Sequence, residues 1–208
     1  MYTVVAEQAA LVIACGALAR EITCLIELNQ WTNLRVQCVP AKIHNHPEQI
    51  PDAVRALIQK ARPVYNNIYI AFADCGTGGL LDAVIEQEKV QRLPGAHCYE
   101  FYAGSEAFEA MQEQELGTFY LTDFLARHFD RIILSELGIN KHPELREVYF
   151  SNYKKLVYLA QTDNPELAKR AQDAAIKLNL DYEFRRTDYG GLQHGLKQFT
   201  ESIVQWQN

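Results

Sequence analysis

The sequence predicts a mostly parallel α/β fold of the Rossmann-like, three-layer type, with helices on both faces of the sheet. Short apolar runs such as 9–14 and 68–73 have the length and continuity of strands that are buried on both faces. Segments whose apolar residues recur at helical spacing follow these runs. Strands that alternate with helices of about 10 to 15 residues are typical of βαβ units. Right-handed crossovers then place the ends of all parallel strands on one edge of the sheet.

Four strand–helix units are expected in the first half of the chain. The run 9–14 is continuously apolar and ends at Cys15-Gly16, and residues 34–39 alternate apolar with polar side chains, as in a strand nearer the sheet edge. The strand 68–73 ends in a glycine-rich loop, and a fourth strand is expected near 90–93. Each strand therefore ends beside polar or reactive side chains.

The second half continues the pattern with shorter signals. Residues 118–123 could form a fifth strand, or their last two residues could cap the following helix. A buried strand is expected at 156–160, before a helix over 165–178, and a last strand at 182–186 precedes a helix that reaches Trp206. The aromatic-rich segment 145–153 is expected to be an amphipathic helix, serving either as a homodimer surface or as part of the core.

Length, charge and cysteine usage restrict the classes of function. A chain of 208 residues is expected to form a single α/β domain over residues 1–208. A formal charge of -6 disfavours a nucleic-acid partner. No apolar run approaches the roughly 20 residues that span a bilayer, and Met1 to Glu7 lacks a leader pattern, so a cytoplasmic protein without a membrane partner is expected. Five cysteines without close pairing indicate free thiols.

Three of these cysteines are candidate ligands of a soft metal. Cys15, Cys75 and Cys98 follow three different predicted strands, whose ends a parallel sheet could bring together. His97, or a histidine of the 44–46 loop, would add an imidazole. Thiolate and imidazole are ligands that zinc prefers, and three protein ligands with an open position are typical of a catalytic site. The alternatives are thiols that pack in the core or act as nucleophiles.

A glycine-rich loop is the second candidate. Its backbone N–H groups, together with the start of a helix, could bind a phosphate or carboxylate of a cofactor. A tight turn that requires positive φ explains the same glycines. The residues concerned are Gly76, Thr77, Gly78 and Gly79.

Charged side chains near these strand ends could complete an active site. Asp74 and Glu100 each lie within two residues of a candidate thiol, where a carboxylate can move protons or orient a histidine. Arg20 lies in the first turns of the first helix, where it could hold an anionic small-molecule substrate. Each of these side chains could equally be a helix cap or a solvated surface residue.

The motifs together resemble a known family. The segments that carry the resemblance are 14–22, 44–48, 74–79, 95–100 and 117–124. With them the chain resembles the bacterial and archaeal domain-of-unknown-function family DUF1638, which has no assigned reaction. The resemblance implies a setting beside corrinoid-dependent methyltransferase systems, and a corrinoid protein or a methyltransferase as partner.

The leading hypothesis is a zinc-dependent enzyme of one-carbon or methyl-group metabolism. It would act by methyl transfer that involves a thiol, a corrinoid or a small methylated substrate. One alternative is a non-catalytic accessory protein that binds a corrinoid, nucleotide or other cofactor. Another is a metal-free enzyme with a single nucleophilic cysteine.

Overall fold

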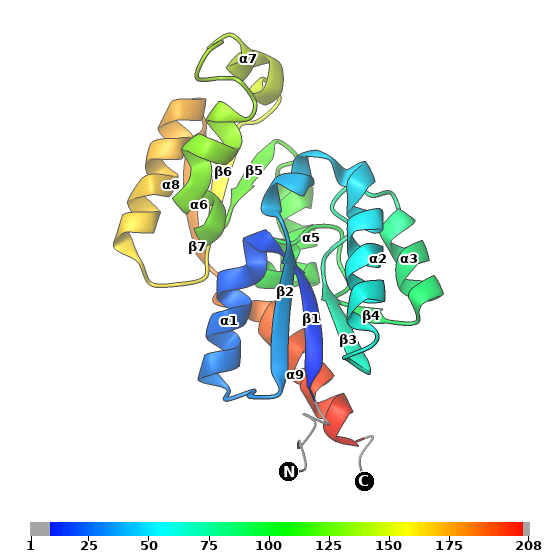
Figure 1. Ribbon diagram of the computed structural model, residues 1–208. Coiled ribbons are helices and arrows are strands. Elements are labelled where there is room, and N and C mark those ends of the chain that lie inside the picture. The colour runs from blue at the N-terminus through cyan, green and yellow to red at the C-terminus, as the bar shows by residue number, and fades with distance from the viewer. Residues whose placement is uncertain (1–8, 206–208) are drawn as a thin grey trace. The chain divides into compact units, whose positions relative to one another are not determined.

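The computed structural model describes residues 9–205, and it contains two separate parallel sheets, each flanked by helices (Figure 1). The predicted Rossmann-like α/β class with parallel strands is confirmed. The chain divides into two compact units where the sequence predicted a single domain. Unit 1 combines residues 1–98 with 191–208, and unit 2 is the segment 99–190. The predicted lack of a leader in Met1 to Glu7, and the predicted helix end at Trp206, lie outside the described residues.

Unit 1 contains a four-stranded parallel sheet with the order β2-β1-β3-β4. Ala10 at the start of β1 is paired with Leu34 on one side and with Asn67 on the other. The chain moves from β1 outward to β2 and then crosses back to β3, so the direction of winding reverses between β1 and β3. Such a reversal leaves a crevice at the carboxyl ends of the two strands, where ligands bind in open α/β sheets. The strands are β1 (Ala10–Cys15), β2 (Leu34–Val39), β3 (Asn67–Ala71) and β4 (Gln91–Arg92).

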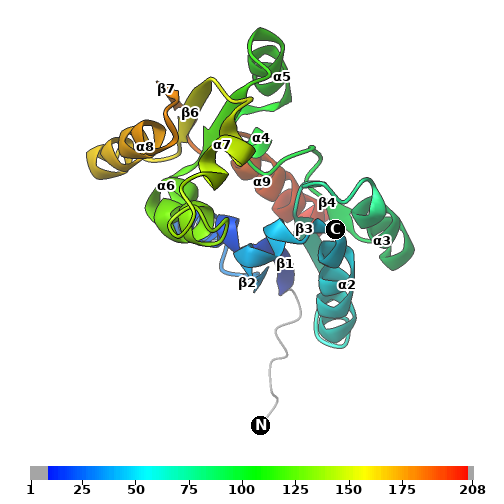
Figure 2. The ribbon, with the colours of Figure 1, turned by 90° about the horizontal axis from the view of Figure 1, so that it is seen from above.

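Helices cover both faces of this sheet. Figure 2 shows α9 on one side of the sheet and α2 on the other. The ring of Phe199 in α9 stacks on Tyr69 of β3, with ring centroids 4.6 Å apart. Short 3-10 turns at 16–18, 41–45 and 47–49 shape the loops at the carboxyl edge. The helices of unit 1 are α1 (Ala19–Leu28), α2 (Ile50–Ala61), α3 (Leu80–Glu88) and α9 (Gly190–Gln205).

Unit 2 contains a three-stranded parallel sheet with the order β5-β6-β7. Its strands are β5 (Thr118–Leu121), β6 (Lys155–Ala160) and β7 (Asp181–Arg186), and its helices are α4 (Glu100–Ala103), α5 (Ser105–Gln114), α6 (Asp123–Phe129), α7 (Leu145–Phe150) and α8 (Pro165–Leu178). A π-helical turn, Asp130–Ser135, follows α6. Each new strand of this sheet is added on the same side of the strand before it. Right-handed crossovers therefore place α6 and α8 on the same face of the sheet.

The core of unit 2 has one apolar cluster on each face of its sheet. Leu156 and Tyr158 of β6 pack with Leu167 and Leu178 of α8 on one face. Val157 and Leu159 alternate with them and join a second cluster with Phe108 of α5. A strand that is buried on both faces must be apolar throughout, which is the reason that its sequence was easy to recognise.

The loop at 122–123 does not belong to the sheet that holds the cysteines. The sequence predicted a single sheet, but β5 pairs with β6 in the separate sheet of unit 2. Thr122 also caps α6, since its side-chain oxygen accepts a hydrogen bond from the backbone N–H of Leu125. Within residues 9–205, no helix is both long and apolar enough to cross a membrane.

Candidate functional site

Three cysteine side chains of unit 1 lie together where the strands of its sheet end. Cys15 is the last residue of β1, Cys75 follows β3, and Cys98 follows the loop after β4. The Sγ atoms of Cys75 and Cys98 are 3.2 Å apart, and the Cys98 thiol also hydrogen-bonds to Cys15. All three side chains are buried, and all are free thiols. The crevice between β1 and β3 therefore ends in a cluster of three thiols.

Backbone pairing beyond β3 and β4 brings Cys75 and Cys98 together. The N–H of Asp74 donates to the carbonyl of Gly95 (3.0 Å), and the N–H of Cys75 donates to that of Ala96 (2.8 Å). These bonds extend the parallel ladder past the regular strands, so the loop after β4 runs beside the loop after β3. The regular part of β4 is only two residues long, so the sequence did not predict that the pairing continues into the following loop.

His44 supplies the imidazole beside the thiols. It lies in the 3-10 turn Ala41–Asn45, and its ring donates a hydrogen bond to the sulfur of Cys75. Gly16 allows this approach, because a Cβ there would lie 3.0 Å from the carbonyl oxygen of Val39 and 3.0 Å from the N–H of Ala41. His44 itself is exposed, so this side chain lies between the buried thiols and the solvent.

The other histidines near the cluster take different positions. His46 is 63% exposed, and its ring nitrogen lies 3.5 Å from a carboxylate oxygen of Glu48. His97 is half-buried in the irregular loop that precedes Cys98. The sequence left open whether His97 or a histidine of the 44–46 loop would join the thiols, and the structure brings His44 to Cys75.

The electrostatics of the cluster favour thiolates at two of the three cysteines. The pKa of Cys75 is lowered to about 5, first by the hydrogen bond from Cys98 and then by His44, against the opposing effect of burial. Cys98 also lowers the pKa of Cys15. Its hydrogen bonds to Cys15 and Cys75, reinforced by burial, raise the pKa of Cys98. The hydrogen bond to Cys75 raises the pKa of His44, although partial desolvation of the ring opposes it. Cys98 is thus the thiol that keeps its proton, and it lies between two cysteines whose pKa values are lowered, one of them beside the imidazole of His44.

Cys75 adopts a backbone conformation that favours glycine. Its φ is +50°, in the left-handed region, which costs a residue with a side chain about 1–2 kcal/mol. Conformations of this kind are concentrated at functional sites, where the surrounding structure holds them in place. Here the hydrogen bond from the Cys75 N–H to Ala96 and the sulfur contact with Cys98 hold this residue.

The glycine-rich loop is organised around the carboxylate of Asp74. This carboxylate accepts hydrogen bonds from the N–H groups of Gly78 (3.1 Å) and Gly79 (2.9 Å) and from the hydroxyl of Thr77. Desolvation raises the pKa of Asp74, but the hydrogen bonds from Thr77 and the glycine N–H groups outweigh it and lower the pKa overall. An external anion would have to compete with Asp74 for these donors.

Replacing Asp74 by alanine is expected to lower the free energy of unfolding by about 1 kcal/mol. The two glycine N–H groups and the Thr77 hydroxyl would lose their acceptor, but the glycine donors are exposed and can turn to water. Chemical denaturation followed by circular dichroism measures the change. A loss above about 3 kcal/mol would mean that Asp74 supports more than its own loop.

The remaining candidate residues are dispersed. Arg20 is exposed on α1 of unit 1. Glu100 is the first residue of α4 in unit 2, where its carboxylate accepts a hydrogen bond from the Ser105 hydroxyl (2.6 Å). Gly76 lies beside Pro47, so the glycine-rich loop adjoins the segment that follows His44. Cys24 and Cys38 are half-buried on α1 and β2.

The thiols and His44 touch one another without surrounding a common centre. Across residues 9–205, no three or more His, Cys, Asp or Glu side chains are placed so that they could hold a metal ion as they stand. A metal could bind the cluster only if side chains turned from these positions.

Comparisons with known proteins give one match. A family described as "Protein of unknown function (DUF1638)" matches residues 38–196. Neither the search of curated proteins nor the search of solved structures gives a match. The matched range includes Cys75, Cys98 and His44 but begins after Cys15.

Proposed function

The chain belongs to the DUF1638 family, and from the side chains that its fold gathers we propose that it is an enzyme with a zinc-type metal centre. The proposed ligands are Cys15, Cys75, Cys98 and His44. The observation that carries the proposal is the convergence of three buried thiols and one imidazole at the carboxyl edge of one sheet, from the end of β1 and three separate loops.

The chemistry of this donor set supports a soft metal. Thiolates and imidazole are the ligands that zinc selects, whereas hard cations prefer oxygen. The cluster also lies at the point between β1 and β3 where ligands bind in folds of this type. Three thiols leave a fourth position that either His44 or a substrate could occupy.

Binding would require local movement. Rotation of the cysteine side chains about χ1 can redirect the sulfur atoms, and such rotations are between staggered conformers. Metal binding also releases the proton that Cys98 holds, because only the thiolate is a ligand. The arrangement in which Cys98 is hydrogen-bonded to Cys15 and Cys75 would then be the metal-free form of the site.

Reaction type and substrate class are part of the same proposal. Zinc held by thiolates supplies a Lewis acid that lowers the pKa of a bound water or thiol. Arg20 could hold an anionic substrate, and Asp74 could move protons, as the sequence suggested. A small methylated substrate, a corrinoid partner and one-carbon metabolism are proposed on the family resemblance alone.

Metal content tests the proposal directly. Elemental analysis of the protein, purified without chelator, is expected to find about one equivalent of zinc or a similar metal. Cys75→Ser and Cys98→Ser are each expected to reduce this to below about a tenth of an equivalent, because a hydroxyl is a poor ligand for a soft metal.

Cys24→Ser is the matched control. Cys24 is half-buried on α1 and lies outside the cluster, so its removal is expected to leave the metal content unchanged. Less than about a tenth of an equivalent in the unaltered protein would remove the metal proposal, as would equal metal loss from the Cys24 variant.

The contact between Cys75 and Cys98 favours a second candidate, an enzyme that uses a thiol without metal. A protonated thiol 3.2 Å from a cysteine can stabilise the thiolate that attacks a substrate. This candidate predicts that one cysteine of the metal-free protein is alkylated by iodoacetamide far faster than the others at neutral pH. Mass spectrometry of the alkylated peptides identifies it, and uniform rates would exclude this candidate.

A further inference from the structure

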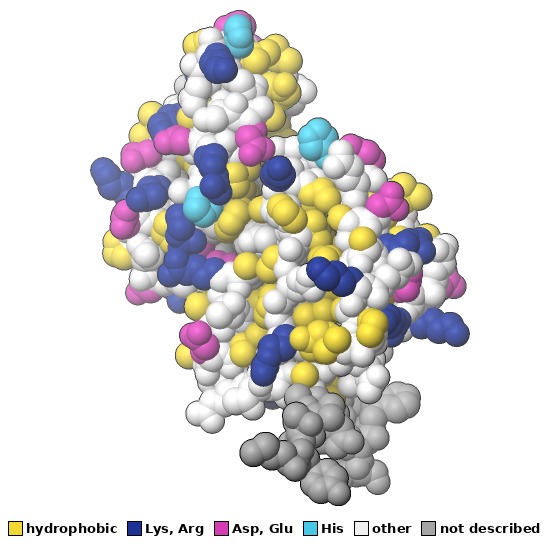
Figure 3. All heavy atoms as spheres, in the orientation of Figure 1, with side chains coloured by type: hydrophobic (Ala, Val, Ile, Leu, Met, Phe, Trp, Pro, Cys, Tyr) yellow, Lys and Arg dark blue, Asp and Glu magenta, His cyan; other side chains and the backbone are white. Residues whose placement is uncertain are grey.

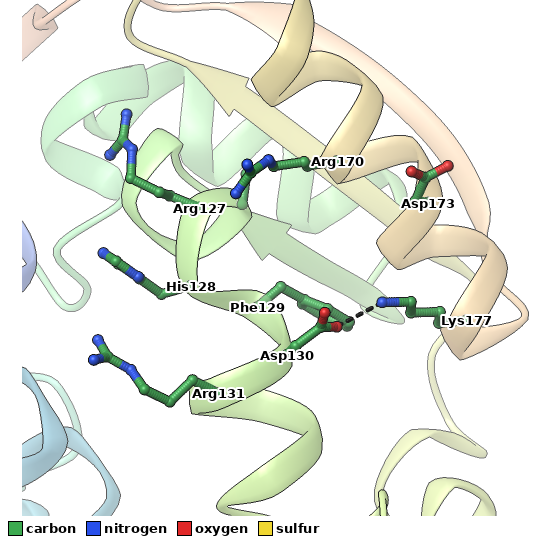
Figure 4. A pocket seen from close by; sticks show the side chains of 9 residues that line it. Arg127, His128, Phe129, Asp130, Arg131, Arg170, Asp173 and Lys177 are labelled. Atoms are coloured by element: carbon green, nitrogen blue, oxygen red, sulfur yellow. Dashed lines mark hydrogen bonds and ion pairs between the residues drawn. The ribbon is translucent and has the colours of Figure 1, made fainter.

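Unit 2 contains a cavity of about 380 Å³ between α6 and α8 that plays no part in the thiol site. Its volume lies within the range of small-molecule sites. Figure 4 shows Arg127, His128 and Arg131 projecting to one side of α6 and the turn that follows it, with Arg170 extending from α8 toward α6. Basic side chains predominate in the lining, which comprises Ala126, Arg127, His128, Phe129, Asp130, Arg131, Arg170, Asp173 and Lys177.

Part of this positive charge is unbalanced. Lys177 forms an ion pair with Asp130 (2.6 Å), and Arg170 forms one with Glu166 on its own helix (2.6 Å). Within residues 9–205, Arg127 and Arg131 have no carboxylate at ion-pair distance. In Figure 4 the carboxylate of Asp173 lies apart from the guanidinium groups of these two arginines.

The positive charges of the lining act together on one side chain. Arg127 and Arg131 lie four residues apart, on either side of His128 in Figure 4. Burial lowers the pKa of His128, and the charges of Arg131, Arg127 and Arg170 lower it further, so all three guanidinium groups act on one ring.

The local backbone is irregular at the same place. His128 has non-helical angles (φ -116°, ψ 16°), and a π-helical turn begins at Asp130. Turns of this kind are often found at functional sites. Figure 3 shows Lys and Arg side chains gathered over the region of α6 and α8, on a protein whose formal charge is -6. The basic character of this region is therefore not a consequence of overall composition.

The geometry points to a binding site for the phosphate group of a small molecule, formed by Arg127, Arg131 and Arg170. Guanidinium groups bind phosphate oxygens through paired N–H donors, which a dianionic phosphate can accept from more than one side. An anion in the cavity would also balance the charge of Arg127 and Arg131, for which the described residues supply no carboxylate at ion-pair distance. The cavity is large enough for more than the phosphate, so either a phosphate ester or free phosphate could be the ligand.

Isothermal titration calorimetry with inorganic phosphate and with adenosine 5′-monophosphate tests this assignment. Saturable binding is expected, and Arg127→Gln and Arg170→Gln are each expected to weaken it about tenfold or more, because each removes a charged donor. Tighter binding of the ester identifies a phosphate ester as the ligand, and equal binding identifies the free anion.

Lys169→Gln provides the control. Lys169 is exposed on α8 beside Arg170 in sequence, but it does not line the cavity. Its removal changes the charge of the protein by the same amount and is expected to change the affinity by less than about twofold. Two results would overturn the assignment. One is no saturable binding of either probe up to about 10 mM, and the other is an equal loss of affinity in the Lys169 variant.

Discussion

Replacing Asp123 by alanine is expected to lower the free energy of unfolding by about 3–5 kcal/mol. Asp123 is 1% exposed and lies at the carboxyl end of the sheet of unit 2. Its carboxylate is the common acceptor of four hydrogen bonds. The donors are the Tyr158 hydroxyl (2.7 Å), the N–H groups of Gln161 and Thr162 (3.1 Å each) and the Thr162 hydroxyl.

The size of the effect follows from the donors that would remain. Each buried donor without an acceptor costs about 1–3 kcal/mol, and water can reach only the side of the network at the half-buried Thr162. The backbone N–H of Asp123 in turn donates to the Gln161 side chain (2.7 Å), so the loops after β5 and β6 are fixed to each other. Denaturant titration followed by circular dichroism measures the loss.

Tyr158→Phe is the matched control for this network. It removes one donor and leaves Asp123 with its other three, so a loss of only about 1–2 kcal/mol is expected. Burial and the neighbouring Asp123 carboxylate raise the pKa of Tyr158, so its hydroxyl remains a donor at all ordinary pH values. Equal effects of the two substitutions would contradict the assigned role of Asp123.

Gly190→Ala is expected to destabilise the protein by about 3–5 kcal/mol. A Cβ at this position would lie 2.1 Å from the carbonyl oxygen of Tyr102 and 3.0 Å from that of Phe101. Both atoms belong to the backbone, which cannot move aside as a flexible side chain can. The φ of Gly190 is +41°, so the new side chain would also be strained locally. Thermal denaturation of the purified variant measures the change.

Gly78→Ala separates the two causes. Gly78 also has a positive φ, +62°, but no atom lies within 4 Å of the position that its Cβ would take. Only the conformational cost of about 1–2 kcal/mol is expected there. If Gly190→Ala destabilised the protein no more than Gly78→Ala, the close approach of Tyr102 would not constrain Gly190.

The sequence predicted individual elements well where one physical signal dominated. The strand at 34–39 has the predicted bounds because apolar and polar residues alternate over that range. The helix at 165–178 has the predicted bounds because a proline at its first position and a continuous apolar face both indicate it. The strand at 118–123 was ambiguous because both interpretations hold: β5 ends at Leu121, and Thr122 caps α6.

Strand pairing was harder to predict than the strands themselves. Nothing in a βαβ pattern states which strand the next one joins, so the sequence could not separate the sheet of β1–β4 from that of β5–β7. The same limit applies to the thiols. Position at strand ends suggested Cys15, Cys75 and Cys98, but the approach of His44 depends on Gly16 and on the 3-10 turn after β2.

The basic cavity was missed because its residues carry no recognised motif. The available signal was two arginines four residues apart: Arg127, on a helix that begins directly after a strand, and Arg131, in the turn that follows this helix. Their meaning depends on Arg170, which is distant in sequence and joins them only because α6 and α8 cover the same face of one sheet.

The division of the chain has a consequence for its synthesis on the ribosome. Unit 2 is inserted into unit 1, so α9 is translated only after unit 2. Phe199 of this helix covers Tyr69, and Gly195 fits closely against Leu93. Part of one apolar face of the sheet that carries the thiols therefore stays uncovered until α9 has been translated. A nascent chain that stopped before residue 191 would expose that face to chaperones and to aggregation.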